Sequence, residues 1–384
     1  MSPQVSRHHY AALDGLRGLA ALFVVFYHAP WITHFSDMRL VKNAYLSVDF
    51  FFVLSGFVIA ANYGRAIADG AALRDFMKRR FFRLYPLHFV VLMALVALEA
   101  VKFAARGAVS SEVAAFTGPN SPSLLVENLL MAQGLGIEDR LGWNPPSWSV
   151  SAEFVAYLLY GVAVLRGWLR GTRAFAGLSV LALLTYVAIA SSQHTLDLTG
   201  FWGLARCFAG FALGVALQRF SPTAAQLAEP SRGARLAALS PFAALACLLA
   251  LSFAQGAAVW IVVPLFVAMV ATLQFDRGAV AALLDSAPMQ FLGRVSYSIY
   301  LLHMPILHVA TIALKRLPGV ATHVGAHGMT LELASPWLGD LCFAGVVTGV
   351  LILARFTHAF IEEPGRKLGG ARSSLRQFSV PARG

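Results

Sequence analysis

The sequence predicts an all-α integral membrane protein with about ten transmembrane helices and both termini in the cytoplasm. Hydrophobic residues make up 58% of the chain and charged residues 13%, whereas soluble domains are roughly 45–50% apolar and about 25% charged. Apolar segments long enough, or nearly so, to cross about 30 Å of hydrocarbon recur along the chain. They lie at 16–32, 44–62, 84–103, 150–165, 175–190, 201–217, 236–253, 257–275, 291–314 and 338–361. Around Gln255-Gly256 the sequence fits either a hairpin between the two flanking segments or no true break between them.

The distribution of basic residues predicts the orientation of these spans. With the N-terminus inside, 21 of the 30 Lys and Arg residues fall in inside loops and tails, and 7 fall in outside loops. This threefold excess follows the positive-inside rule, so the net charge of +11 reflects membrane topology rather than binding to nucleic acid. No cleavage motif follows the first apolar run, and we expect that run to remain as an uncleaved anchor.

The chain is predicted to form one membrane domain, residues 1–369, followed by a basic tail, residues 370–384. The tail is poor in apolar residues, a composition that predicts disorder. The three cysteines lie in apolar runs, with neither a disulfide framework nor a metal-ligand spacing, so we expect no metal.

The first span carries an arginine and a histidine on one helical face. Arg17 and His28 are eleven residues apart, which is about three turns and roughly 16 Å along a helix. A charge at the centre of a membrane costs about 2.5–3.5 kcal/mol to insert, so such residues usually face a bundle interior or a wet cavity. The purely structural alternative makes Arg17 a surface anchor and His28 a packing residue.

The second span and the loop after it hold three more candidates. Asp49 lies among phenylalanines, where a carboxylate needs a partner or must stay protonated. Arg80 and Arg83 are three residues apart and share one helical face at the cytoplasmic surface. Such a pair suits a phosphate group, because guanidinium groups stay charged and bind two oxygens at once. Positive-inside anchoring alone explains the neighbouring Lys78 and Arg79.

Glu153 and His303 complete the set of candidates. Glu153 lies at the outer end of the fourth span, where a carboxylate that complements the helix dipole is the structural alternative. His303 continues the three-residue spacing of Tyr297 and Tyr300 in the ninth span, and a structural histidine fits there equally well. The closing Glu362-Glu363-Pro364-Gly365 is most simply a helix stop.

Six segments occur in an order that is typical of one family. They are LDGLRGLAALFVVFYH (13–28), SVDFFFVLSGFVI (47–59), RRFFRLYP (79–86), WSVSAEF (148–154), SYSIYLLH (296–303) and EEPGRK (362–367). Each segment alone is a weak signal, but six in order with a matching topology are a strong one. From Tyr10 to Lys367 the chain resembles the membrane-bound acyltransferase-3 family of bacterial inner-membrane O-acyltransferases.

The resemblance implies an enzyme that moves an acetyl or other short acyl group from acyl-CoA on the cytoplasmic side to a hydroxyl at the outer face. The acceptor would be a carbohydrate or a glycolipid. The family's arginine-to-histidine motif falls on Arg17 and His28, and its paired-arginine motif on Arg80 and Arg83. Its WSLSVEE-like motif keeps Glu153 here and replaces the second glutamate with Phe154, which argues against a scheme with two carboxylates at that place.

Some relatives carry a soluble hydrolase-like domain after the last helix. We expect this chain to act alone or to pass its acyl group to a separate periplasmic protein. The loops at 104–147 and 318–336 are expected to shape the acceptor site.

In the mechanism that these residues suggest, Arg17, Arg80 and Arg83 hold the CoA phosphates. His28 then acts as a general base or takes the acyl group covalently, and the sequence leaves both routes open. Asp49 or Glu153 would orient His28, with His303 as a further catalytic candidate. Tyr297 or Tyr300 would donate a hydrogen bond to the oxyanion.

Two other classes of function stay open at this stage. A transporter or flippase for a lipid-linked sugar would use intramembrane charges to line a path, but it predicts inverted repeats that the sequence does not show. A scaffold that binds an acyl ligand without turnover would make Arg17, His28 and Glu153 dispensable.

Overall fold

The computed structural model describes residues 9–105, 114–221, 230–325 and 328–370. Within these ranges nine helical segments are long and apolar enough to cross a membrane. A tenth, α1, has 17 residues and reaches about 26 Å at 1.5 Å per residue. The predicted all-α membrane class is therefore confirmed. The predicted tail lies outside the described residues, apart from Gly370.

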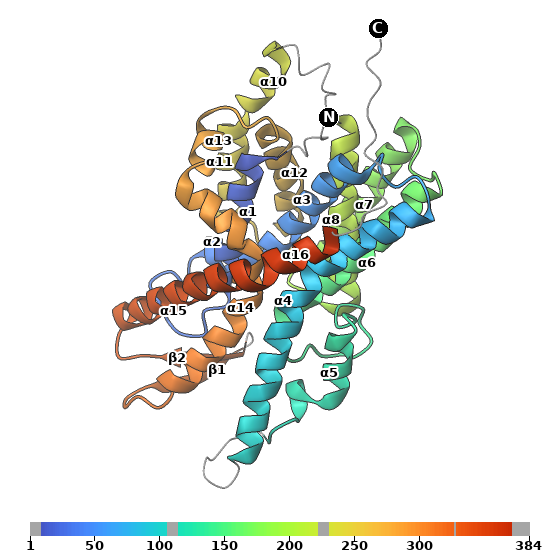
Figure 1. Cartoon of the computed structure of the whole chain (residues 1–384). Coiled ribbons are helices and arrows are strands. Elements are labelled where there is room, and N and C mark those ends of the chain that lie inside the picture. The colour runs from blue at the N-terminus through green and yellow to red at the C-terminus, as the bar shows by residue number, and fades with distance from the viewer. Residues whose placement is uncertain (1–8, 106–113, 222–229, 326–327, 371–384) are drawn as a thin grey trace.

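Each of the ten predicted spans overlaps a long helix (Figure 1). These helices are α1 (Ala11–Tyr27), α3 (Ser47–Tyr63), α4 (Gly70–Ala104), α6 (Trp148–Leu165), α7 (Thr172–Gln193), α8 (Gly200–Phe220), α11 (Ser240–Phe253), α12 (Val262–Leu273), α14 (Ala287–Leu314) and α15 (Pro336–Thr357). Around Gln255-Gly256 the chain forms a hairpin, because α11 and α12 pack against each other and Gly256 has a φ of +52°.

Shorter elements join or extend the long helices. They are α2 (Arg39–Lys42), η1 (Ala44–Leu46), η2 (Gly118–Asn120), α5 (Pro122–Leu129), η3 (Pro145–Ser147), α10 (Pro230–Ala237), η4 (Gly256–Ile261), α13 (Ala279–Leu284), β1 (Ala321–Gly325), β2 (Gly328–Glu332), η5 (His358–Glu362) and α16 (Glu363–Gly370).

Two close helix crossings hold the bundle together, and glycines make both possible. Where α1 crosses α14, a Cβ added to Gly18 would lie 2.4 Å from the backbone nitrogen of Gly293. Where α3 crosses α8, a Cβ on Gly56 would lie 2.0 Å from the carbonyl oxygen of Phe211, and one on Gly214 would lie 2.0 Å from that of Val53. Small residues let helices approach closely in lipid, where packing rather than the hydrophobic effect drives association.

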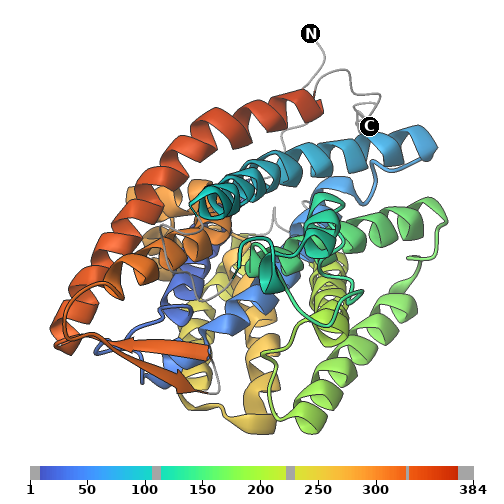
Figure 2. The ribbon, with the colours of Figure 1, turned by 90° about the horizontal axis from the view of Figure 1, so that it is seen from below.

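Helix α4 is longer than a membrane needs. Its 35 residues extend about 52 Å, and Pro86 lies inside it. Figure 1 shows α16 lying across α4, and in Figure 2 the C-terminal helices run beside α4. Gly365 packs directly on Phe82 and Pro86, since an added Cβ would lie 3.0 Å and 2.8 Å from atoms of these residues. Helix α16 therefore packs against the half of α4 that carries Arg80 and Arg83.

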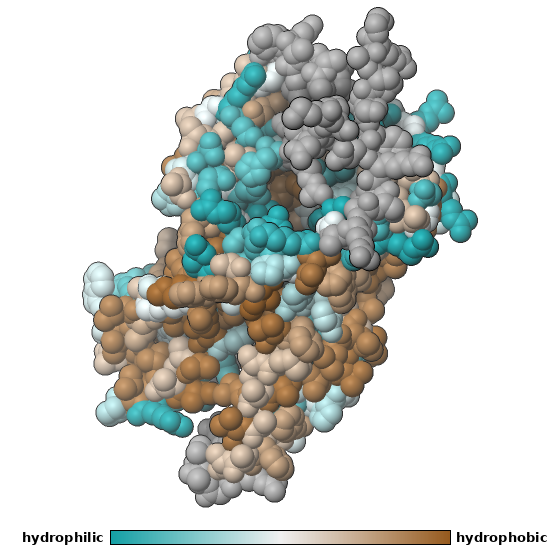
Figure 3. All heavy atoms as spheres, in the orientation of Figure 1, coloured by the Kyte–Doolittle hydropathy of each residue, from teal (hydrophilic) through white to brown (hydrophobic). Residues whose placement is uncertain are grey.

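The surface divides into apolar and hydrophilic regions. In Figure 3 the lower half of the face is largely apolar, over α15 and the second half of α4, while hydrophilic residues gather across its middle and upper part. Exposed large apolar side chains on α4, α7, α11 and α15 include Val101, Leu181, Phe242 and Leu341. Such a surface suits contact with lipid acyl chains.

One feature departs from a purely helical fold. Strands β1 and β2 pair antiparallel as a hairpin, with Ala321 opposite Glu332. Leu331 also exchanges backbone hydrogen bonds with the segment after α1, donating to Pro30 and accepting from Ile32. The hairpin thus covers the end of α1, within the segment at 318–336 that the sequence assigned to the acceptor side.

The α3–α8 crossing leads to a stability prediction. We expect Gly56→Ala to lower the free energy of unfolding by about 1–3 kcal/mol, because the new methyl group meets a backbone carbonyl that cannot move freely. Thermal unfolding in one detergent measures this effect. Gly349→Ala in α15 is the matched control, because a Cβ there meets no atom within 4 Å, and it should not destabilise the protein. Equal melting temperatures for the two variants would contradict the role of the crossing.

Candidate active site

A cavity with an empty volume of about 880 Å³, part of it open to solvent, lies inside the bundle. Helices α1, α3, α4, α6 and α14 line it. Its polar wall is formed by Arg17, Ser55, Arg80, Arg83, Ser149, Glu153, Tyr157, Ser296, Tyr297 and Tyr300. The structure therefore brings together all three predicted phosphate-binding arginines and Glu153, which are far apart in the sequence. We call this the arginine cavity.

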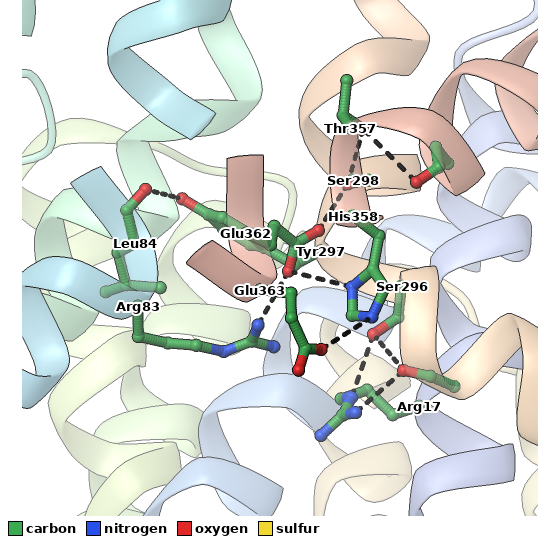
Figure 4. Close-up of polar contacts among 12 residues, drawn as sticks. Arg17, Arg83, Leu84, Ser296, Tyr297, Ser298, Thr357, His358, Glu362 and Glu363 are labelled. Atoms are coloured by element: carbon green, nitrogen blue, oxygen red, sulfur yellow. Dashed lines mark hydrogen bonds and ion pairs between the residues drawn. The ribbon is translucent and has the colours of Figure 1, made fainter. Parts of the chain in front are cut away.

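Arg17 reaches across the close α1–α14 crossing (Figure 4). Its Nε donates to Ser296 Oγ at 2.9 Å and its Nη2 donates to the carbonyl oxygen of Gly293 at 2.8 Å. Its Nη1 lies 2.8 Å from a carboxylate oxygen of Asp14, one helical turn away. The guanidinium is thus held on three sides, while its side chain keeps 31% of its surface exposed.

Arg83 pairs with Glu362, whose side chain is fully buried (Figure 4). The ion pair spans 2.7 Å between Arg83 Nη1 and Glu362 Oε2, and Ser298 donates a short hydrogen bond to the same carboxylate. Glu362 ends the π-helical turn η5, a type of turn that often marks functional sites. The sequence suggested only a helix stop here. The structure shows instead that this glutamate positions Arg83.

Arg80 is held mainly by aromatic rings. Its guanidinium carbon lies 5.2 Å from the ring centroid of Tyr63 and 5.9 Å from that of Tyr157, and Nη2 donates to the Tyr63 hydroxyl. The ion pairs found among the described residues do not include Arg80. Tyr157 also donates to Glu153 and contacts Ser55 Oγ at 2.9 Å. Glu153 is thereby fixed on the wall of the arginine cavity.

His28 lines a second cavity, whose empty volume of about 530 Å³ includes space open to solvent. We call it the histidine cavity. Its wall includes Tyr27, Tyr45, Trp148, Asp197, Thr199, Arg206 and Tyr300, together with Leu141, Pro145 and Pro146. Tyr300 lines both cavities. The predicted loop at 104–147 thus contributes to the wall near His28.

His28 and His303 lie together, with ring centroids 5.0 Å apart. Nδ1 of His28 lies 2.9 Å from the carbonyl oxygen of Val24, and Nδ1 of His303 lies 2.6 Å from that of Tyr300. A carbonyl only accepts, so each Nδ1 must carry the proton, and each Nε2 is left with its lone pair in the neutral ring. His303 is fully buried and lines neither cavity.

Asp49 has a different partner from the one that the sequence suggested. It pairs with Arg206, at 2.5 Å from Nη2 and 3.1 Å from Nε, and it accepts a hydrogen bond from Tyr186. Hydrogen bonds among the described residues join neither Asp49 nor Glu153 to His28. The carboxylate in the cavity with His28 is Asp197, which accepts a short hydrogen bond from Tyr27.

The two tyrosines suggested as oxyanion donors use their hydroxyl protons elsewhere. Tyr297 donates to the carbonyl oxygen of Leu84 at 2.6 Å. Tyr300 donates to that of Pro146 at 3.0 Å and lies 2.7 Å from Ser149 Oγ. Neither hydroxyl has a proton left for a substrate in this arrangement, so the geometry does not favour that role.

Glu362, Arg206 and Asp197 are the site residues that the sequence did not single out. A signal existed for Arg206, a lone arginine in an apolar span that needs a counter-ion. Glu362 and Asp197 lie next to apparent helix ends, where carboxylates are common, so composition alone did not distinguish them. Among the described residues no group of three or more His, Cys, Asp or Glu side chains could hold a metal ion.

A helical membrane bundle that encloses cationic and histidine-bearing cavities has the architecture of a membrane-embedded enzyme. The chain matches the acyltransferase domain family over residues 10–355, most of its length, and it belongs to that family. It is therefore an integral membrane acyltransferase that transfers groups other than aminoacyl groups.

Several characterised or named proteins are similar to the chain. The acyltransferase MdmB of Streptomyces mycarofaciens is 26% identical, over 100% of this chain and 97% of that protein. Protein 2 in the picA locus of Rhizobium radiobacter is 32% identical, over 47% of this chain and 95% of that protein. The peptidoglycan O-acetyltransferase OatA of Listeria monocytogenes is 24% identical, over 95% of this chain, which spans only 57% of OatA. No solved structure matches the chain significantly.

The Asp49–Arg206 pair leads to a second stability prediction. We expect Asp49→Ala to lower the free energy of unfolding by about 3–5 kcal/mol, since it leaves a buried guanidinium without its counter-ion. The shift in the midpoint of thermal unfolding measures this loss. Asp37→Ala is the control, because Asp37 is 96% exposed in its pair with Lys42 and should produce no measurable change. A small shift for Asp49→Ala would show that the pair does not hold the bundle together.

Proposed function

We propose that this protein is an O-acyltransferase that uses acetyl-CoA, or another short acyl-CoA, on the cytoplasmic side. It transfers the acyl group to a hydroxyl of a carbohydrate or glycolipid at the outer face of a bacterial inner membrane. The observation that carries this proposal is the pair of cavities that share Tyr300 in their walls. One offers cations to a phosphate-bearing donor, and the other offers a basic nitrogen to a hydroxyl.

The donor side of the proposal rests on Arg17, Arg80 and Arg83. All three line the arginine cavity, and Arg17 and Arg83 are already held in place by Asp14 and Glu362. Arg80 rests on aromatic rings instead, so its charge stays available to an incoming anion. Arginines bind phosphate oxygens in pairs and stay charged inside a protein. The acyl-pantetheine arm of the donor would extend from these arginines along the cavity toward Tyr300.

The chemical step rests on His28. Its Nε2 takes the proton from the acceptor hydroxyl while the hydroxyl oxygen attacks the thioester carbonyl carbon. The carbon–sulfur bond then breaks, an ester forms, and the imidazolium returns the proton to the CoA thiolate. The neutral tautomer required for this step is the one that the hydrogen bond to Val24 selects. Direct transfer therefore needs no rearrangement of the histidine. The second route is a covalent acyl-histidine.

The relatives support a carbohydrate acceptor, since one of them is named a peptidoglycan O-acetyltransferase. Membership of the acyltransferase family favours catalysis over the transport of a lipid-linked sugar. Handover of the acyl group to a separate periplasmic protein stays a prediction.

The proposal is tested by mass spectrometry of envelope and secreted glycans. A deletion strain complemented with the wild-type gene should show a glycan with an added acyl mass, and one complemented with His28→Ala should not. Both proteins must reach the membrane in equal amounts, which immunoblotting controls. Identical glycan profiles in the two strains would contradict the assignment of His28 as the base.

The donor site makes a separate prediction for the purified enzyme. Arg80→Gln should raise the apparent KM for acetyl-CoA about ten- to hundredfold, as expected for the loss of one charge-assisted hydrogen bond to phosphate. CoA release measures the rate, and Arg74→Gln, an exposed arginine on α4 outside the cavity, is the matched control. If the two variants have the same KM as the wild type, Arg80 does not contact the donor.

A further inference from the structure

The histidine cavity has a wall that the proposed chemistry has not yet used. Besides His28 it contains Asp197 and Thr199, which belong to the connection between α7 and α8. On the other side it contains Leu141, Pro145 and Pro146, from the connection that leads into α6. Both connections fall on the outer side of the membrane in the topology that the basic residues predict. The cavity is therefore built from loops at the face where an acceptor would arrive.

Tyr27 contacts both Asp197 and His28 and so links the two residues. The Tyr27 hydroxyl donates a short hydrogen bond to Asp197 Oδ2. The Tyr27 ring meets the His28 imidazole edge to face, with centroids 4.9 Å apart and an interplanar angle of 84°. A carboxylate has about four lone-pair sites, so Asp197 can accept further hydrogen bonds from a ligand. Asp197 is itself exposed, which leaves these sites accessible.

The loop that carries Asp197 is anchored to the bundle interior. Nη1 of Arg206 donates to the carbonyl oxygen of Leu198 at 2.7 Å, and Arg206 is only 2% exposed. Asp49 holds the same guanidinium by two further hydrogen bonds. The buried Asp49–Arg206 pair thus fixes Leu198, the residue next to Asp197. Anchoring this loop gives the deeply buried charge pair a role in the site. Supporting hydrogen bonds of this kind hold the residues of a binding site in one geometry.

The charge and the aromatic content of the cavity indicate which acceptor it fits. The charge of Arg206 is already neutralised by Asp49, so Asp197 leaves the cavity with a negative character. A phosphate or carboxylate would be repelled, whereas a neutral hydroxyl can donate to Asp197. The rings of Tyr45, Trp148 and Tyr300 offer apolar faces to the C–H groups of a sugar ring.

We propose that the histidine cavity is the acceptor site and binds an uncharged sugar unit, with Asp197 accepting a hydrogen bond from one sugar hydroxyl. A neighbouring hydroxyl then faces His28, which removes its proton as it attacks the thioester. This inference rests on the proposed function and adds the place and the chemical class of the acceptor. Tyr300 forms the floor of the site and separates the sugar from the donor.

The test blocks this cavity from outside. Thr199→Cys places a thiol on an exposed residue of its wall, and Gln193→Cys places one on an exposed residue at the end of α7 that does not line it. Complemented cells are treated with MTSET, a cationic thiol reagent that does not cross membranes. Newly added acyl groups on envelope and secreted glycans are then measured by mass spectrometry. The treated proteins are purified, and their thermal stabilisation by acetyl-CoA is measured.

We expect MTSET to reduce glycan acylation at least tenfold in Thr199→Cys and to leave it unchanged in Gln193→Cys. Acetyl-CoA should stabilise both treated proteins as it stabilises the wild type. Unchanged acylation in labelled Thr199→Cys would overturn the proposal. Loss of both acylation and stabilisation would also overturn it, because the cavity would then serve the donor. If untreated wild-type cells acylate no glycan, the proposed function itself fails, and the inference falls with it.

A second variant tests the role of the charge without a bulky reagent. Asp197→Asn should lower glycan acylation about ten- to hundredfold, as expected for the loss of a charge-assisted hydrogen bond. Stabilisation by acetyl-CoA should remain at the wild-type level, which also shows that the variant is folded. Wild-type acylation in Asp197→Asn would exclude Asp197 as the residue that recognises the sugar.

Discussion

The requirement that every charge inside a bilayer has a partner governs this structure. Arg83 pairs with Glu362, Arg206 with Asp49, and Arg17 with Asp14 and the polar atoms of α14. The first two pairs join residues from different helical elements, which the bundle must bring close for the charges to be tolerated. The charges therefore constrain the packing of the helices, and the same packing holds the arginines at the wall of a cavity.

Glycines set how closely the helices approach, and the polar contacts depend on that distance. Arg17 reaches the backbone carbonyl of Gly293 because Gly18 and Gly293 allow α1 and α14 to touch backbone to backbone. The α3–α8 crossing at Gly56 and Gly214 likewise brings Asp49 and Arg206 together. Side chains at these positions would push apart the pairs on which the site depends.

An acyltransferase in a membrane has to bind a donor and activate an acceptor, and the two cavities suit these two tasks separately. A donor with phosphates needs cations and comes from the aqueous side that holds CoA, whereas a hydroxyl acceptor needs a base. Arg17 and His28 both belong to the first span, yet they line different cavities, and Tyr300 lines both. In the proposed mechanism the reacting groups would meet where the thioester reaches this tyrosine.

The sequence by itself determined the class of the fold and the approximate spans, and it singled out Arg17, His28, Arg80, Arg83 and Glu153 as candidates, because hydropathy and rare intramembrane charges are local signals. It did not determine which partner each charge would find. Only the tertiary structure assigned Asp49 to Arg206, Glu362 to Arg83, and Asp197 to the cavity of His28. These residues are far apart in the sequence and meet only through the packing of the helices, and no local pattern in the sequence records that packing.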